Sequence, residues 1–499
     1  MNILLITSDQ HHWATIGKNT PEIATPNLDR LCEKGICFNR AYTVNPTCTP
    51  TRASIITGKY PSQHGAWTLG TKLPESEPTV GDEFIKAGYR TALVGKAHFH
   101  PLNSTELYPS LEADAVMMDL DFWKKFNGPF YGFQHVELAR NHTSEYHVGQ
   151  HYVLWLEKKG CHNWRDYFQQ PTGNMNPSHE LTWDIPEEYH YNTWIAERTN
   201  ALLDEYAKNK DPFFLWASFF DPHPPYLVPE PYASMYDPDE VTVPKLHPRE
   251  HNLNSPFHKL SQDTNPDTSQ YRLSGFGIHG VHSHLRDEAH LRKQIAVYYG
   301  MITMMDKYIG QILDNLEARG LCDDTVVVFT TDHGHFFGHH GLVAKGPFMY
   351  EDLIKLPFIV SCPEQQEKGT VSSAIQSLVD LPETFLSFCD LPLPDGTSGV
   401  NQKDVWLGRT KEARTWASCE HHHERGSVNV RTYINATHKL SLYDHMQHGE
   451  LFDLANDPGE THNRWDDPDY AKVKAQLLYE FAMAEIRKEP KFMPRVADA

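Results

Sequence analysis

The sequence contains no long hydrophobic run. Its longest apolar stretch, DPFFLWASFF at 211–220, is about half as long as the ~20 residues that a helix needs to cross a bilayer, and it has the length of a buried strand. The first residues, MNILLITSD, lack the basic region and the small-residue cleavage site of a secretory signal peptide. We therefore expect no membrane partner and, with Met1 as the true start, a cytoplasmic location.

Cysteine and positive charge are also scarce. Eight cysteines in 499 residues are spread too thinly for a disulfide scaffold, so most of them are expected to be buried thiols. Lys and Arg number 45 against 65 Asp and Glu, which gives a formal net charge of −20. This acidic balance disfavours a nucleic-acid partner, and an anionic substrate requires a local basic site that opposes the overall field.

Short apolar runs alternate with helical patterns along the chain. Helical patterns cover 25–35 and 293–320, and both stop at a glycine. Continuous apolar runs indicate strands buried on both faces, so the alternation predicts an α/β fold with a mostly parallel sheet between helices. In such sheets ligands bind at the carboxyl ends of the strands. The runs end in charged residues, histidine or cysteine, and they lie at 2–9, 89–99, 212–223, 325–334 and 357–362.

The length predicts more than one domain, because a single core stops growing at ~250–300 residues. We expect a large domain over 1–399 and a smaller one over 400–499. Segments 103–192 and 229–290 are rich in Pro, His, Asn and aromatic residues, and we interpret them as long insertions around the site or at a subunit contact, which leaves a homo-oligomer open. Beyond residue 400, alternating segments, an Asp-Pro-Gly turn and a helical pattern from 469 predict a small antiparallel sheet with a covering helix.

One cysteine occupies a distinctive place in NPTCTPTRASIITG, residues 45–58. Cys48 lies between two prolines at the start of a helical pattern, and Arg52 follows one turn later. A helix N-terminus stabilises negative charge through its N–H groups and dipole, and a guanidinium adds fixed planar donors. Together these features predict a nucleophile rather than a core thiol.

The string CTPTRASIITG resembles the sulfatase signature C-x-P-x-R-x4-T-G, which Cys48, Pro50, Arg52, Thr57 and Gly58 match. The resemblance implies an alkaline-phosphatase-like fold and a cysteine that a formylglycine-generating enzyme, a transient partner, oxidises to formylglycine. In that family the hydrated aldehyde is a geminal diol, of which one oxygen attacks sulfur and the other then expels sulfate. A plain Ser or Cys sulfate ester would be hard to break again, whereas a hemiacetal ester eliminates.

Acidic residues at two strand ends look like the family's metal site. Asp9 follows the first run, Asp332 and His333 follow VVVFTT, and the resemblance adds the formylglycine oxygen at position 48 as a ligand of one divalent ion. The common sulfatase pattern has Asp-Asp and Asp-Asn at these places, whereas Asp9-Gln10 and Asp332-His333 are similar to the choline-sulfatase and phosphonate monoester hydrolase branch. The family implies Ca²⁺, while an imidazole ligand favours Mn²⁺ or Zn²⁺.

Further cationic groups follow other strand ends. GKAHF supplies Lys96 and His98, which are two apart on an extended chain and so on one face. By the resemblance, Lys96 contacts sulfate and His98 supports the nucleophile or the leaving group. His223 in FDPHPPY matches a histidine on the leaving-group side, and Lys345 matches a second sulfate-binding lysine. Substrate binding is therefore expected at Gln10, Lys96, His223 and Lys345.

Other histidines lie close in sequence to these residues. His11, His12, His100, His335, His339 and His340 are expected mostly to surround the site or face solvent. The tract EHHHERG at 420–426 has the composition of a metal tract, but we interpret it as a polar loop.

The favoured interpretation is a sulfatase that cleaves the S–O bond of a sulfate monoester. Cys48, Arg52, Lys96, His98, His223 and Lys345 are its expected catalytic residues. The Lys-x-His pair favours sulfate, since the phosphonate hydrolases carry hydroxyl residues there. The alternatives are a phosphonate monoester or phosphodiester hydrolase on the same scaffold, and a non-catalytic protein that binds sulfated ligands. The substrate is expected to be a small carbohydrate or aryl sulfate, and its identity stays open because the fold is shared across many esters.

Overall fold

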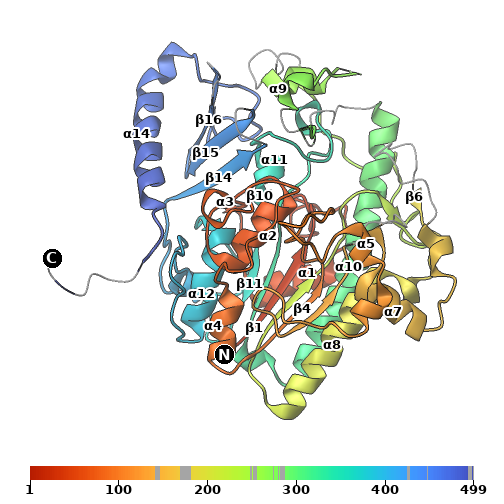
Figure 1. The fold of residues 1–499 in the computed structure, drawn as a ribbon. Helices are drawn as coiled ribbons and strands as arrows, with labels where there is room; N and C mark the ends of the chain where they lie inside the picture. Colours follow the sequence, from red (N-terminus) through yellow and green to blue (C-terminus); the bar gives the residue numbers. More distant parts are fainter. Residues whose placement is uncertain are drawn as a thin grey trace.

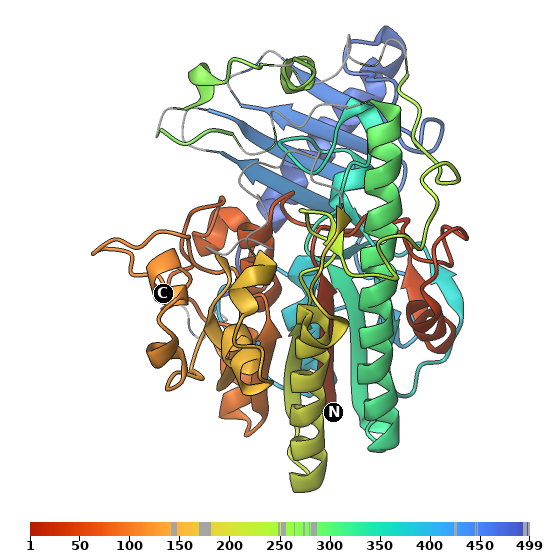
Figure 2. The same ribbon diagram turned by 90° about the vertical axis from the view of Figure 1, so that its right-hand side faces the viewer.

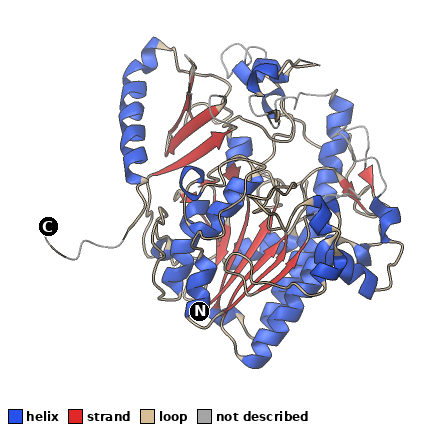
Figure 3. Ribbon diagram, in the orientation of Figure 1, coloured by secondary structure: helices blue, strands red, loops and turns tan. Residues whose placement is uncertain are grey.

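A central sheet with helices on both faces forms the core of the fold (Figures 1 and 3). Its strand order is β12-β2-β11-β9-β1-β7-β4-β5. The strands are β1 (Asn2–Ser8), β2 (Ile36–Phe38), β4 (Arg90–Gly95), β5 (His135–Leu138), β7 (Phe213–Ser218), β9 (Thr325–Thr331), β11 (Ile359–Ser361) and β12 (Thr370–Ser372). The strands from β9 to β5 are parallel, whereas β11 is antiparallel to both of its neighbours. The predicted α/β class with a mostly parallel sheet is confirmed.

The computed structural model describes the whole chain except for several short stretches. These are 141–146, 169–180, 248–249, 251–255, 264, 273–274, 279, 281–286, 424–426, 445, 447, 493–496 and 498–499. None of the helices within the described residues is long and apolar enough to cross a membrane.

Alternate side chains of β1 enter two separate cores. Leu4 and Ile6 pack among residues of one set of helices, and Ile3 and Leu5 pack among residues of the other set. This explains why the N-terminal run is apolar without alternation: helices cover both faces of the strand. The first set includes α1 (Pro26–Lys34), α8 (Tyr191–Asn209) and α10 (Glu288–Ala318), and the second includes α2 (Cys48–Thr57), α4 (Val80–Lys86) and α12 (Leu381–Phe388). Figure 2 shows α8 and α10 running side by side along one flank.

The C-terminal part folds as predicted, into a four-stranded antiparallel sheet with α14 (Ala471–Arg487) packed on one face. The strands are β14 (Trp416–His422), β15 (Asn429–Asn435), β16 (His438–Tyr443) and β17 (Gly449–Asp453). The prediction of a polar loop over EHHHERG is wrong for 420–422, which belong to β14. Residues 424–426 lie outside the described residues. Polar composition hid the strand, because Glu420 and His421 are buried by tertiary contacts.

Backbone contacts join this small sheet to the loop before Cys48. The N–H of Glu420 donates to the carbonyl of Val44 at 2.7 Å, and the side-chain amide of Asn45 donates to the carbonyl of Glu420 at 2.6 Å. The remaining elements are short. They are α3 (Pro61–His64), α5 (Asp114–Met117), α6 (Leu120–Trp123), α7 (Gln150–Lys158), α9 (Pro256–Ser261), α11 (Glu351–Ile354), α13 (Lys403–Trp406), β3 (Ala41–Tyr42), β6 (Leu181–Thr182), β8 (Leu227–Val228), β10 (Lys355–Leu356) and β13 (Gln376–Ser377).

The segment 103–192, which we interpreted as an insertion, contains a strand of the main sheet. β5 pairs with β4 at the sheet edge. Its polar residues His135 and Glu137 interrupt the apolar run by which the other strands are predicted. The predicted boundary at residue 400 falls before α13, whose Trp406 packs in the second core. The segment 229–290 carries α9 among irregular structure in its described parts.

Most of the free cysteines are buried, as expected: Cys48, Cys161, Cys362 and Cys419 are buried, and Cys322 and Cys389 are more accessible. Cys32 and Cys37 form a disulfide, with 5.8 Å between their Cα atoms.

Candidate active site

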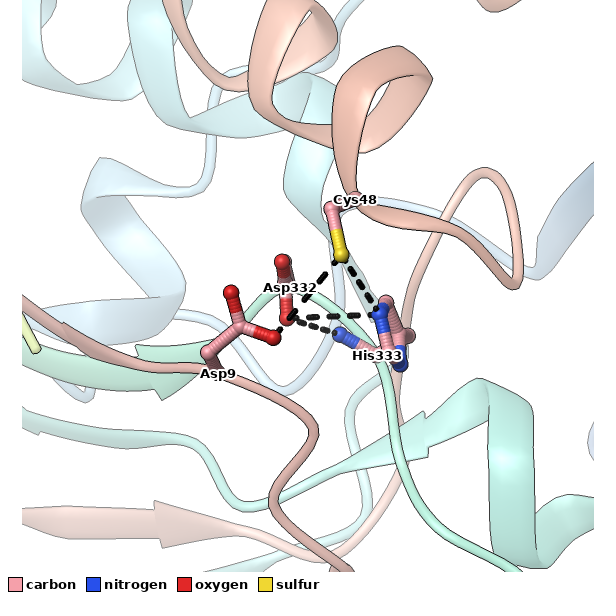
Figure 4. Close-up of side chains that lie close together, drawn as sticks. All are labelled: Asp9, Cys48, Asp332 and His333. Atoms are coloured by element: carbon pink, nitrogen blue, oxygen red, sulfur yellow. Dashed lines mark hydrogen bonds and ion pairs between the residues drawn. The ribbon is translucent and has the colours of Figure 1, made fainter. Parts of the chain in front are cut away.

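Four adjacent parallel strands end at one edge of the sheet and place the predicted residues there. Because Ser8 of β1 pairs with Thr331 of β9, the next residues, Asp9 and Asp332, come side by side. Ligand atoms of Asp9, Cys48, Asp332 and His333 all lie within 4.8 Å of one another, and all four residues are buried (Figure 4). The sheet thus brings together the complete predicted metal set.

Cys48 is the first residue of α2 and points toward this cluster (Figure 4). Its Sγ atom lies 3.2 Å from Nε2 of His333 and 3.8 Å from Oδ1 of Asp9. The side chain of Asn45 accepts the N–H and the hydroxyl of Thr47 at 2.8 and 2.6 Å. The turn before the helix is therefore fixed independently of whatever binds at Cys48.

Arg52 lies one turn further along α2 and is fully buried. Its Nε donates to Asp332 at 2.9 Å and its Nη2 to Asp9 at 3.1 Å. Its Nη1 donates to the Lys96 carbonyl at 2.9 Å and to the Ser218 hydroxyl at 2.8 Å. Although burial opposes its charge, Asp332 and Asp9 raise the pKa of Arg52. Arg52 thus ties the two carboxylates to the ends of β4 and β7.

Two buried lysines face the sulfur atom. Nζ of Lys345 lies 3.1 Å from Sγ of Cys48 and 3.2 Å from Nε2 of both His223 and His333. Nζ of Lys96 lies 2.5 Å from Oδ2 of Asp9 and 3.9 Å from the sulfur. Burial and Asp9 raise the pKa of the Cys48 thiol, but Lys345 and Lys96 outweigh them, and its pKa lies below the ordinary value. In a chain of net charge −20, this is a local site for an anion.

The donors at this edge fit a divalent ion. Both side-chain amide atoms of Gln10 are buried and lack a partner in the described part of the chain. Nδ1 of His333 lies 3.0 Å from the Gly334 carbonyl, so it carries the proton and leaves the lone pair of Nε2 for a metal. Two carboxylates, an amide oxygen and an imidazole form a mixed O/N set of the kind that first-row divalent ions accept. The backbone of Gln10 has a φ of 59°, a conformation that non-glycine residues rarely adopt outside constrained sites.

His98 is less directly placed than predicted. β4 ends at Gly95, and His98 has a φ of 60°, so the extended geometry that put Lys96 and His98 on one face does not hold. Nε2 of His98 lies 2.7 Å from Nη2 of Arg140. Arg140 and its partner Glu112 were missed in the sequence, because both lie in the segment interpreted as an insertion.

The neighbouring histidines form hydrogen-bonded networks. Nδ1 of His12 accepts the N–H of Ala14 at 3.2 Å, so its Nε2 carries the proton that goes to Asp352 at 2.9 Å. His340 bonds Glu250 and lies 3.3 Å from Asp352. Burial lowers the pKa of His340, but Asp352 and Glu250 raise it to about 9. His12, His339 and Asp352 have ligand atoms close enough for a metal, and the proton on Nε2 of His12 already occupies its contact with Asp352.

His11, His100 and His335 make similar protein contacts. They bond to Thr15, Tyr131 and Tyr226 respectively. These histidines support the loops around the site, as expected for most of them.

The fold and the site define an alkaline-phosphatase-like hydrolase. The Sulfatase family model matches residues 1–391, and a model described as the C-terminal part of N-sulphoglucosamine sulphohydrolase matches 338–488. The chain therefore belongs to the sulfatase family and is a sulfuric ester hydrolase.

Relatives cover nearly the whole chain. An arylsulfatase of Clostridium perfringens is 28% identical over 97% of this chain and 94% of its own length. An N-acetylglucosamine-6-O-sulfatase of Bacteroides thetaiotaomicron is 26% identical over 96% of this chain and 85% of its own. The solved phosphonate monoester hydrolase of Agrobacterium radiobacter shares the fold, with a TM-score of 0.78 at 22% identity over 98% of this chain and 96% of its own.

Proposed function

We propose that the protein hydrolyses a sulfate monoester by S–O cleavage, with a formylglycine derived from Cys48 as the nucleophile and one divalent cation in the site. The observation that carries this proposal is the position of Cys48. It heads α2 beside Asp9, Asp332 and His333, and its sulfur lies 3.1 Å from Nζ of Lys345. The Cys48 sulfur stands where a hydrated formylglycine would carry its two hydroxyl groups.

The ion would be held by Asp9, Gln10, Asp332 and His333, together with position 48. It would supply positive charge at the reacting oxygens. Family membership favours Ca²⁺, and the imidazole of His333 favours Mn²⁺ or Zn²⁺. Arg52 holds both carboxylates in place, because its guanidinium bonds to each of them.

The first step transfers the sulfuryl group. One hydroxyl of the diol gives its proton to a basic group of the site as its oxygen attacks sulfur, the bond from sulfur to the ester oxygen breaks, and the departing alkoxide takes a proton. Lys96 and Lys345 bind the sulfate oxygens, whose charge they neutralise. The Nδ1–H of His223 donates to the Pro224 carbonyl at 2.6 Å, so Nε2 accepts from Nζ of Lys345 at 3.2 Å. The proton for the alkoxide therefore comes from the Lys345 ammonium and reaches the leaving group through Nε2 of His223.

The second step regenerates the aldehyde. The remaining hydroxyl loses its proton to a basic group of the site, the carbonyl bond forms, and sulfate leaves with the electrons of its C–O bond. Water then hydrates the aldehyde. Only this second step needs the second hydroxyl, so a serine or cysteine at position 48 would stop after the first.

The proposed substrate is a small aryl or carbohydrate sulfate. The relatives named for aryl and N-acetylglucosamine sulfates support this class. The formylglycine-generating enzyme is the proposed transient partner, and the homo-oligomer and the catalytic residue set stay predictions.

Mass spectrometry of the peptide 41–59 from natively expressed protein, paired with aryl-sulfate turnover, tests the proposal. Conversion of Cys48 together with loss of turnover in Cys48→Ala is the expected result. Unmodified Cys48 in fully active protein would refute the mechanism. Unmodified Cys48 in inactive protein that still binds sulfated ligands would favour the non-catalytic alternative.

A phosphonate monoester or phosphodiester hydrolase is the second candidate. It is supported by Gln10 and His333 in the ligand set and by the fold of the Agrobacterium enzyme. The ratio of kcat/KM for an aryl sulfate to that for the matching aryl phosphonate separates the two candidates. A ratio above one supports the sulfatase, and a ratio below one supports the hydrolase.

A further inference from the structure

A buried arginine lies where the ends of β4 and β5 meet. The N–H of Ala139 donates to the Gly95 carbonyl at 3.2 Å, so Arg140 follows β5 beside the residues that follow β4. The side chain of Arg140 is 6% exposed. Nη1 donates to the His100 carbonyl at 2.9 Å and lies 3.3 Å from Oε1 of Glu112. Nη2 lies 2.7 Å from Nε2 of His98.

This last contact determines which nitrogen of His98 carries the proton. A guanidinium has donors only, so Nε2 of His98 must accept and Nδ1 must hold the hydrogen. Burial lowers the pKa of His98, and Arg140, Lys96 and Arg52 lower it further, well below the ordinary value. The ring is therefore neutral across the physiological range. Nδ1 is buried and has no partner in the described part of the chain.

The backbone around His98 is held by the same group of residues. The carboxylate of Glu112 accepts the N–H groups of His98, Phe99 and His100 at 2.9, 2.8 and 2.8 Å. These three bonds stabilise the positive φ at His98, and Arg140 compensates the buried charge of Glu112. His98 follows Lys96 by two residues, and Lys96, Arg52 and Asp9 are near enough to act on the charge of its ring, so the ring borders the proposed catalytic residues.

We infer that Arg140 is a positioning residue that fixes His98 as the neutral Nδ1–H tautomer, and that His98 is a dedicated hydrogen-bond donor to an oxygen of the nucleophile or of the bound sulfate. The inference deepens the proposed function and rests on it for the identity of the accepting oxygen. It makes specific the expectation that His98 supports the nucleophile or the leaving group.

Matched replacements of His98 test the donor role. The amide nitrogen of His98→Asn takes the place of Nδ1, whereas that of His98→Gln takes the place of Nε2. We expect His98→Asn to retain at least about ten times the kcat of His98→Gln and His98→Ala, as for other groups that orient or bond a reacting centre. Equal loss in all three variants would overturn the donor role.

Variants of Arg140 test the positioning role. Two-bond ¹⁵N spectra of labelled histidine, with His98 assigned from the His98→Asn variant, should show the Nδ1–H tautomer in the native protein. In Arg140→Met the ring should gain the other tautomer or an ionisation visible in the pH titration, and kcat should fall about 10- to 100-fold. Arg140→Lys keeps a cationic donor, so it should restore part of the native tautomer population and part of kcat.

A double-mutant cycle separates this role from a merely structural one. If Arg140 acts through His98, Arg140→Met should add little to the loss of kcat caused by His98→Ala. Additive losses, or an Nε2–H tautomer in the native protein, would overturn the inference. A protein without sulfatase activity would refute the proposed function, while the spectra would still decide whether Arg140 sets the tautomer of His98.

Discussion

Nζ of Lys345 lies 3.1 Å from Sγ of Cys48, although 297 residues separate them in the sequence. Lys345 also lies 3.2 Å from His223 and from His333, so one ammonium group meets the proposed nucleophile position, the proposed proton donor and a proposed metal ligand. This makes Lys345 the group whose removal should affect the reaction most selectively.

Lys345→Met should lower kcat/KM for an aryl sulfate by about 10²- to 10³-fold, the usual loss when one donor to a developing anion is removed. Lys355→Met is the control, because Nζ of Lys355 lies over the ring of Trp13 at 3.8 Å, away from the cluster. Steady-state kinetics on both variants, with Cys48 conversion measured in each, provide the comparison. Equal losses in the two variants would contradict the role of Lys345.

Gln10→Ala should weaken binding of the divalent ion by at least about tenfold. Both side-chain amide atoms of Gln10 are buried and lack a partner in the described part of the chain, and its backbone N–H bonds to Asp332. Metal content after dialysis and titration of the apoprotein measure the affinity. Gln150 supplies a matched control, since its amide is equally buried and unpartnered in the described part of the chain but begins α7. Gln150→Ala should leave the metal content unchanged. A loss of metal in Gln150→Ala would show that the loss in Gln10→Ala reflects general destabilisation.

Arg52→Met should destabilise the metal-free protein by about 3–5 kcal/mol, because it leaves Asp9 and Asp332 buried without their shared cation. Denaturant unfolding measures the difference in the free energy of unfolding. Arg30→Met is the comparison, since the pair of Arg30 with Asp314 is partly exposed and should contribute less than about 1 kcal/mol. If Arg52→Met lowers the free energy of unfolding by less than about 1 kcal/mol, the expected role of Arg52 as the shared counter-ion of the two carboxylates would be wrong.

The ion pairs of His340 predict a loss of stability at alkaline pH. Its folded pKa of about 9 lies above the unfolded value of about 6.5, so its contribution is complete below pH 6.5 and disappears as the pH rises through 9. The difference corresponds to about 3 kcal/mol of unfolding free energy. His340→Gln should remove this slope between pH 6.5 and 9 in unfolding experiments.

His64 gives the opposite sign and serves as the control for that measurement. Burial lowers its pKa to about 4, so its contribution is present above pH 6.5 and is lost as the pH falls through 4. His64→Gln should therefore alter only the acid side of the profile. An alkaline slope that survives in His340→Gln would show that another group carries it.

The sequence by itself determined the sheet, the proposed nucleophile position and most of the charged residues of the proposed site. Strands buried on both faces are apolar without interruption, and the next residue lies at the carboxyl edge of the sheet, which is why Asp9, Lys96 and Asp332 are predicted together. Strand β5 is not predicted in this way, because it lies at the sheet edge, where polar residues such as His135 and Glu137 are tolerated and the run is not continuously apolar.

Only the tertiary structure decided how these groups are oriented. The φ of 60° at His98, the choice of its protonated nitrogen by Arg140, and the burial of Glu420 and His421 in β14 all depend on partners distant in sequence. Local sequence patterns indicate which faces of an element are apolar. They carry no signal for the hydrogen bond between Arg140 and His98, which lie 42 residues apart. The sequence therefore specifies which groups reach the site, and the packing of the loops specifies what each group can do there.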